Sequence, residues 1–113
     1  MIKIYGIKNC DSVKKALSFL KKHDLEYELH DFKSEPISCD RISSWLKTID
    51  MKTLFNSRST TYRNFKLKEM NLNDSQKKEW LCKENLLIKR PVVEYKDNVI
   101  VGFNKENFKG VFL

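Results

Sequence analysis

The chain has few of the residues that bend or stiffen a backbone, with three glycines and two prolines among 113 residues. Because 33% of the residues are charged and 41% are apolar, low-complexity and disordered chains are excluded. No apolar run approaches the roughly 18 residues that a membrane span needs, and the first residues lack the apolar stretch of a signal peptide. We therefore expect one cytoplasmic domain over residues 1–113, with its own hydrophobic core and no membrane partner.

Cysteine is also scarce, with only Cys10, Cys39 and Cys82. Three cysteines far apart in sequence match neither a disulfide framework nor the Cys-x-x-Cys spacing of a zinc site. His23 and His30 stand in no metal-ligand spacing. We therefore expect the reduced thiols of a cytosolic protein and no bound metal.

Positive charge is concentrated in the middle of the chain, whose net charge is +7. Residues 58–90 hold nine basic and four acidic side chains, whereas residues 1–40 and 91–113 are balanced. This segment attracts anions, and a lysine-rich solvated helical face is the alternative interpretation. Because the chain has neither a recognition-helix motif nor an aromatic–basic stacking pattern, we expect no direct sequence-specific DNA binding.

Hydrophobic spacing divides the first third of the chain into a strand, a helix and a second strand. Residues 2–6 form the first strand, and apolar residues then recur at helical spacing to about residue 23. Asp11 or Ser12 can cap this helix. Residues 25–29 alternate with period two, so they form a strand parallel to the first.

The remainder of the chain is predicted to be helical and then to return to strands. Ser38 can cap one helix, and Asn73 with Gln76 resembles a capping box that opens another helix to about residue 84, with Trp80 and Leu81 in its core. Two strands at 91–95 and 99–101 flank a tight turn, and Asn104 can cap a final helix.

This order predicts an α/β fold with a thioredoxin-like mixed sheet, βαβ followed by ββα. The core would comprise about residues 1–34 and 86–113. An all-helical insertion would span about residues 35–85.

Cys10 lies in a polar stretch just before the first predicted helix. The free N–H groups and the positive dipole end of a helix favour a thiolate there, and a thiolate is a nucleophile toward disulfides, peroxides and electrophilic oxyanions. We expect Cys10 to be reactive; a small buried hydrophobic residue is the alternative. Cys39 and Cys82 are expected to be structural.

Two arginines could complete a site around this cysteine. Arg58 stands among hydroxyl residues, and Arg90 precedes Pro91, which is a candidate for a cis peptide bond at a strand entry. Guanidinium groups stabilise a neighbouring thiolate and hold oxyanions or carboxylates in their planar forks. A surface salt bridge is the alternative for each arginine.

With these residues the chain resembles the ArsC (arsenate reductase) family, including its Spx and YffB-like branches, over essentially its whole length. The opening Gly-Ile-x-x-Cys-Asp is most similar to the YffB-like branch. The stretches that carry the resemblance are Tyr5–Ala16, Ser34–Ser38, Asn56–Tyr62, Leu86–Val93 and Val101–Phe103.

The resemblance implies a thioredoxin-like domain with a helical insertion, in which Pro91 is the cis-proline. Cys10 matches the nucleophile, and Arg58 and Arg90 match two of three arginines that bind the oxyanion in arsenate reductases. We therefore expect these three residues to be catalytic. We expect the substrate to contact the two arginines together with Asn9, Asp11, Ser12 and Pro91.

The chain also differs from its relatives at informative positions. Gly102 and Phe103 stand in place of the third arginine, and Gly6 and Val13 align with a His and a Ser of the arsenate reductases. Val13 also replaces the second cysteine of the Spx regulators, and Asp50 aligns with a glycine at their polymerase contact.

The resemblance thus implies an enzyme, a glutathione-dependent thiol oxidoreductase with a single nucleophilic cysteine and no bound cofactor. Glutathione or a small oxyanion would be the co-substrate, and glutaredoxin a candidate protein partner. The alternatives are an arsenate reductase proper and an Spx-like redox-linked transcription regulator that binds RNA polymerase.

Overall fold

The computed structural model describes residues 1–113, which form two compact units. The sheet unit comprises residues 1–34 and 90–113, and the helical unit comprises residues 35–89. The boundary expected at residue 85 falls at the start of the short 3-10 helix η2 (Asn85–Leu87) of the helical unit.

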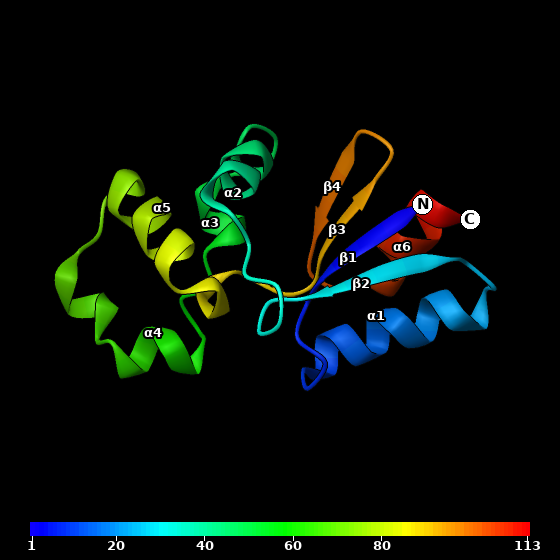
Figure 1. Ribbon diagram of the computed structural model, residues 1–113, viewed down its shortest axis with the longest axis horizontal. Helices are drawn as coiled ribbons and strands as arrows, with labels where there is room; N and C mark the ends of the chain where they lie inside the picture. The colour runs from blue at the N-terminus through cyan, green and yellow to red at the C-terminus, as the bar shows by residue number, and fades with distance from the viewer. The chain divides into compact units, whose positions relative to one another are not determined.

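The sheet unit is built on a four-stranded mixed sheet of order β2-β1-β3-β4 (Figure 1). Strand β1 runs parallel to β2 and antiparallel to β3, and β3 runs antiparallel to β4. This confirms the predicted parallel βαβ pair and the thioredoxin-like α/β arrangement. The strands are β1 (Ile2–Gly6), β2 (Tyr27–Asp31), β3 (Val92–Tyr95) and β4 (Asn98–Val101).

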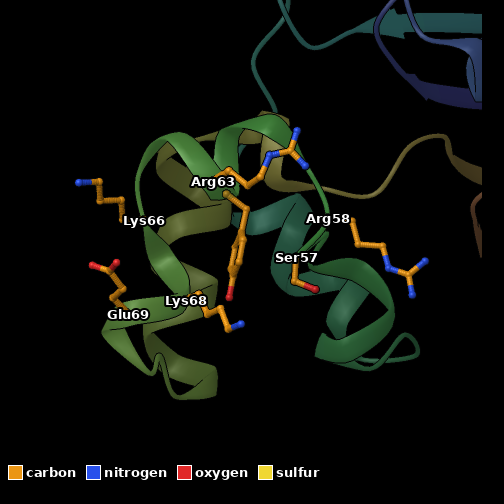
Figure 2. Close-up of a pocket in the computed structure, with 7 residues that line it drawn as sticks. Ser57, Arg58, Arg63, Lys66, Lys68 and Glu69 are labelled. Carbon is orange, nitrogen blue, oxygen red and sulfur yellow. The ribbon is translucent and has the colours of Figure 1, made fainter.

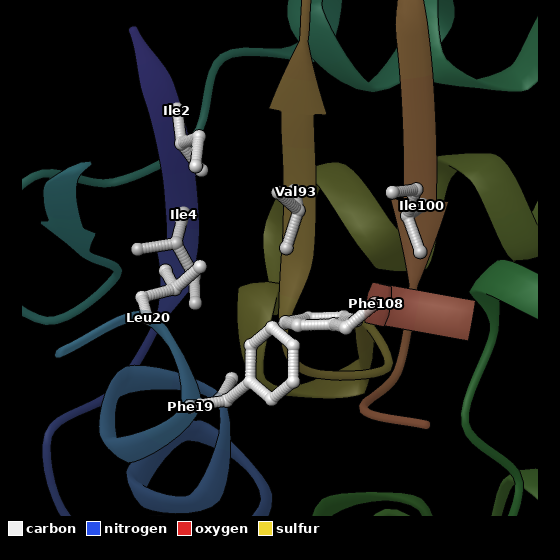
Figure 3. Close-up of a cluster of buried hydrophobic side chains, with 8 residues drawn as sticks. Ile2, Ile4, Phe19, Leu20, Val93, Ile100 and Phe108 are labelled. Carbon is white, nitrogen blue, oxygen red and sulfur yellow. The ribbon is translucent and has the colours of Figure 1, made fainter. Parts of the chain in front are cut away.

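The core of this unit lies between the sheet and two helices, α1 (Asp11–Lys22) and α6 (Lys105–Phe112). Phe19 of α1 meets Phe108 of α6 edge to face, with ring centroids 5.6 Å apart (Figure 3). Burial of such apolar surface is the main stabilising term of a fold. The buried members of this cluster are Ile2, Ile4, Ala16, Phe19, Leu20, Val93, Ile100 and Phe108.

The second strand begins two residues later than the alternation at 25–29 predicted. Helix α1 ends at Lys22, and Asp24 adopts a left-handed φ of 55°. Because the amide of Leu25 then donates to the carbonyl of Leu20, Leu25 belongs to the turn and pairing with β1 starts at Tyr27.

The β3–β4 hairpin matches the predicted tight turn. Lys96 takes a left-handed φ of 55° in this turn, and Tyr95 pairs with Asn98 across it. The Arg90–Pro91 peptide bond that leads into β3 is cis, as the resemblance implied. Gly102 follows β4 with a φ of 82°, a backbone conformation that favours glycine, and its amide donates to the carbonyl of Pro91.

The helical unit consists of short helices joined by tight turns. Its buried side chains include Trp45 and Leu81, which both have no exposed surface, whereas Trp80 is only half-buried against Phe65. The expectation that Trp80 is a core residue is therefore wrong. The helices besides η2 are α2 (Cys39–Leu46), α3 (Met51–Leu54), α4 (Thr60–Asn64), η1 (Leu67–Met70) and α5 (Asp74–Lys83).

Side-chain caps determine where these helices begin. Ser38 caps α2, Asn73 and Gln76 form a complete capping box on α5, and Asn104 caps α6, as predicted. Each cap accepts a hydrogen bond from an amide in the first turn that would otherwise lack a partner. None of the helices combines the length and the apolar character that a bilayer crossing requires.

A disulfide bond joins Cys39 of α2 to Cys82 of α5, with the Cα atoms 5.1 Å apart. The expectation that all three thiols are reduced and form no disulfide is therefore wrong for this pair. The two cysteines are 43 residues apart, and only the packing of α2 against α5 brings them together. Cys10 alone is a free cysteine.

Candidate functional site

Cys10 is itself the N-cap residue of α1, a role that the sequence assigned to Asp11 or Ser12. Its backbone is extended, with φ −134° and ψ 126°, and its carbonyl accepts from the amide of Lys14 at 2.9 Å. The thiol is half-buried and makes no capping hydrogen bond. Because α1 leaves its first amides unpaired, the sulfur stands where a negative charge is stabilised.

The loop that carries Cys10 is held by the ends of the two parallel strands. Asp31, at the end of β2, accepts from the amide of Lys8 at 3.4 Å and from the amide of Lys33 at 2.8 Å. The amide of Phe32 donates to the carbonyl of Gly6 at 2.8 Å. Asp31 thus positions the cysteine loop, a role that no local pattern in the sequence indicates.

Gly6 and Val13, which lie before and after the cysteine loop, pack directly against each other. Gly6 ends β1, and the side chain of Val13, in the first turn of α1, fills the space beside it. Both residues are buried, and Val13 has no exposed surface. The positions that hold a His and a Ser in arsenate reductases thus form an apolar contact here.

Arg90 and Pro91 lie at the same end of β1 as the cysteine loop. Tyr5 of β1 pairs with Val92 of β3, so continuing this antiparallel register brings Pro91 beside Gly6. Pro91 is buried and Arg90 is half-buried. The structure therefore places this proline next to the point where the chain leaves β1 toward Cys10.

Phe103, one of the two residues in place of the third arginine of the reductases, belongs to the aromatic core. Its ring lies 4.9 Å from that of Phe108 and 6.3 Å from that of Phe19, between ring centroids. Since this side chain packs against apolar rings, the position supplies no cation for an oxyanion.

Arg58 lies in the helical unit, on a turn that precedes α4. The side chain of Asn56 accepts from the amide of Arg58 at 3.1 Å, and Ser59 caps α4 by accepting from the amide of Tyr62. The amide of Asn56 in turn donates to the carbonyl of Leu87, which fixes the turn to the interior of the unit. This leaves the Arg58 side chain exposed.

A basic hollow of about 630 Å³ lies beside this turn. Figure 2 shows Lys66 and Glu69 on one side of it and Arg58 on the opposite side. Four cationic side chains and one carboxylate line the hollow, together with two hydroxyl groups, so it favours an anionic ligand. The lining residues are Ser57, Arg58, Tyr62, Arg63, Lys66, Lys68 and Glu69.

The structure thus groups most of the predicted site residues within the sheet unit. Asn9, Asp11 and Ser12 flank Cys10 and are exposed, and Arg90 with Pro91 enters the neighbouring strand β3. Arg58 belongs to the helical unit, so its participation at Cys10 stays a prediction. No group of three or more His, Cys, Asp and Glu side chains has a metal-binding arrangement.

The chain is similar in sequence and in structure to known proteins. Residues 5–111 match the model of the ArsC family. A solved structure described as the YFFB (PA3664) protein superposes with a TM-score of 0.93 at 29% identity and covers 100% of both chains. An arsenate reductase (ArsC) related protein from Brucella melitensis superposes with a TM-score of 0.77 at 33% identity, over 98% of this chain and 93% of that one.

A curated relative, the global transcriptional regulator Spx of Listeria innocua, is 28% identical over 96% of this chain and 85% of its own length. The relatives therefore include both arsenate reductase-like proteins and a transcription regulator. Since the family model spans nearly the whole sequence, the chain belongs to the ArsC family.

Proposed function

We propose that this protein is a glutathione-dependent thiol oxidoreductase in which Cys10 is the nucleophile. The observation that carries the proposal is the position of this free thiol as the N-cap of α1, without a capping hydrogen bond. An uncapped helix start offers unpaired amides to a thiolate, and the thiolate is the form that attacks disulfides.

The proposed reaction is the removal of glutathione from a mixed disulfide. The Cys10 thiolate attacks the glutathione sulfur, a Cys10–glutathione disulfide forms as the original S–S bond breaks, and the other sulfur leaves as a thiolate that takes up a proton. A second glutathione then attacks the glutathione sulfur on Cys10, which releases glutathione disulfide and restores the thiolate. The resolving thiol comes from outside because residue 13 is valine, and glutaredoxin is a candidate for that partner.

Arg58 and Arg90 have a clear task in this proposal. Glutathione carries two carboxylates, and guanidinium groups bind carboxylates through paired hydrogen bonds. Arg90 precedes the strand that pairs beside the cysteine loop, and Arg58 lines the basic hollow of the helical unit. Asn9, Asp11, Ser12 and Pro91 would complete the substrate contacts, and the reaction would take place in the cytoplasm, where thiols are kept reduced.

The test is mass spectrometry of the reduced protein after brief treatment with glutathione disulfide. We expect one glutathione on Cys10, removed by fresh glutathione, and no adduct at that position in the Cys10→Ser variant. A comparison of alkylation rates at neutral pH completes the test, in which Cys10 should react about tenfold faster than free glutathione. A Cys10 that takes up no glutathione and reacts no faster than a free thiol contradicts the proposal.

Arsenate reductase activity is the second candidate, favoured by the related Brucella protein. Against it stand Gly102 and Phe103 in place of the third arginine, with the ring of Phe103 packed against Phe108. Because removal of one cation weakens the electrostatic stabilisation of an oxyanion, we expect arsenate turnover with glutathione and glutaredoxin to stay at the thiol background. Arsenate turnover above this background that disappears in Cys10→Ser would favour arsenate reductase over the glutathione-dependent oxidoreductase.

A regulator that binds RNA polymerase is the third candidate, favoured by the Listeria relative. Asp50, which aligns with the glycine of the Spx polymerase contact, is the N-cap of α3 and accepts from the amide of Thr53 at 2.9 Å. This side chain therefore has a structural task of its own. Co-purification of stoichiometric polymerase with the tagged chain would favour the regulator over the enzyme.

A further inference from the structure

The Cys39–Cys82 disulfide can be reached from solution. Cys39 is exposed and Cys82 is half-buried, although the neighbouring Leu81 and Trp45 have no exposed surface. The bond therefore lies at the edge of the α2–α5 contact rather than inside it. Thiols and small disulfides need such access because exchange proceeds by direct attack on sulfur.

Contacts other than the disulfide also hold the segments that carry the two cysteines near each other. Asn85 accepts from the amide of Ile37 at 2.8 Å and donates to the carbonyl of Leu81 at 3.0 Å. These bonds tie the segment before α2 to the end of α5. Ile42 and Trp45 of α2 are also fully buried, so apolar packing holds α2 in this unit in addition to the disulfide. We therefore expect the two thiols of the reduced protein to stay close enough to form the bond again.

The two sulfurs differ in their surroundings once the bond is reduced. Cys39 is the first residue of α2, after the Ser38 cap, where unpaired amides stabilise a thiolate. Cys82 stands in the last turn of α5, one residue before its end at Lys83, where the helix presents carbonyl groups. Exposure and helix position thus both make Cys39 the more reactive thiol.

We propose that Cys39 and Cys82 form a second, reversible redox pair that exchanges with small disulfides independently of Cys10. The Cys39 thiolate attacks one sulfur of glutathione disulfide and releases one glutathione, which takes up a proton. The Cys82 thiolate then attacks the Cys39 sulfur of the mixed disulfide and releases the second glutathione. The two protein thiols lose two electrons, and one glutathione disulfide becomes two glutathione molecules.

The pair goes beyond the proposed chemistry of Cys10 because it lies wholly in the helical unit and uses none of the sheet-unit residues. It makes the protein a reporter of the thiol–disulfide balance even when Cys10 is occupied. Disulfides of cytosolic proteins are mostly transient or redox-sensing. An accessible cysteine pair between two packed helices is suited to such a role, because the bond can open and close by exchange.

The test uses the full-length Cys10→Ser chain, reduced and then exposed to glutathione disulfide. We expect its mass to fall by two hydrogens, with no lasting adduct, and a thiol reductant to restore the starting mass. With Cys82→Ser added, glutathione should remain on Cys39. With Cys39→Ser added instead, glutathione should reach Cys82 roughly three- to tenfold more slowly.

Two results would overturn the proposal. One is a Cys10→Ser chain that ends with two separate glutathione adducts or two free thiols, and the other is equal rates at Cys39 and Cys82. Circular dichroism confirms that each variant is folded. Should a serine variant unfold, the unmutated chain can be alkylated and mapped by peptide before and after oxidation. A reversible pair should lose alkylation of the Cys39 and Cys82 peptides together on oxidation and regain it on reduction. If Cys10 of the unmutated chain takes up no glutathione, that result contradicts the proposed function and not the redox pair.

Discussion

A Cβ atom added to Gly6 would lie 2.6 Å from Cγ2 of Val13, closer than packed carbon atoms approach. The end of β1 and the first turn of α1 are therefore fitted to each other across the cysteine loop. Gly6→Ala should destabilise the protein by about 1–3 kcal/mol, because Val13 is fully buried and has little room to move. Chemical denaturation of the single variant measures this loss.

The matched control is the same change with the opposing side chain shortened. In Gly6→Ala/Val13→Ala, the new methyl group occupies space that the valine has left. The double variant should therefore be more stable than the sum of the two single losses, by about 1–2 kcal/mol. Simple additivity would show that the two residues do not constrain each other.

Asp31 should keep the cysteine loop ordered through the amides of Lys8 and Lys33. Loss of about 1 kcal/mol of hydrogen bonding in Asp31→Ala should raise the exchange rate of these amides roughly fivefold. Hydrogen exchange followed by NMR measures the rates. Glu26→Ala removes an exposed carboxylate from the same unit and should leave both amides unchanged, so a similar rise in this control would count against the assignment.

Asn85 should be the main polar support of the α2–α5 contact. Asn85→Ala removes two hydrogen bonds and leaves the amide of Ile37 and the carbonyl of Leu81 without them, at a cost of about 2–3 kcal/mol. Thermal or urea unfolding measures the change. Asn64→Ala, at an exposed position of α4, should cost well under half as much, and equal losses would contradict the proposed role.

Asp50 should make the start of α3 sensitive to acid. Hydrogen bonds from the side chain and the backbone amide of Thr53 lower the pKa of Asp50 below its usual 3.8. Because the pKa is lower in the folded state than in the unfolded state, ionised Asp50 stabilises the fold at pH values above the unfolded-state pKa. This stabilisation is lost as the pH falls through the folded-state pKa. The melting temperature of the native chain should thus fall more steeply below about pH 4 than that of Asp50→Asn, which caps without titrating. Parallel curves would contradict this.

Arg58 should contribute to glutathione binding without taking part in bond breaking. Because it is an exposed charge, Arg58→Ala should raise KM for a glutathione mixed disulfide about three- to fivefold and leave kcat nearly unchanged, with a smaller effect at high salt. Steady-state kinetics at two ionic strengths measure this. Lys47→Ala removes one positive charge from the same unit, and a matching rise in that variant would assign the effect to net charge.

Local signals in the sequence predicted much of the fold. Ser38, Asn73 and Asn104 cap helices where expected, because a cap depends on residues within one turn. The βαβ and ββα order followed from hydrophobic periodicity, and the nucleophile candidate Cys10 from its place before a helix. The place of Pro91 at a strand entry made the cis peptide bond before it a candidate, and the family resemblance implied it.

Features that depend on distant packing could not be predicted in this way. The Cys39–Cys82 bond joins helices 43 residues apart in sequence, and no spacing rule indicates that pairing. Trp80 is half-buried because Lys83 and Phe65 cover only part of its ring. Asp31 acts on the cysteine loop only because β2 lies parallel to β1 and ends beside it.

The bond between α2 and α5 also turns the intervening chain into a covalent ring. This ring contains α3, α4 and the basic residues from Arg58 to Lys68. A protease that cuts once inside the ring leaves both pieces attached, and they migrate as one polypeptide until a reducing agent is added. Trypsin can therefore cut the exposed basic segment from Arg58 to Lys68 while the disulfide keeps the two fragments joined. Electrophoresis with and without a reducing agent would distinguish the cut chain from the intact chain.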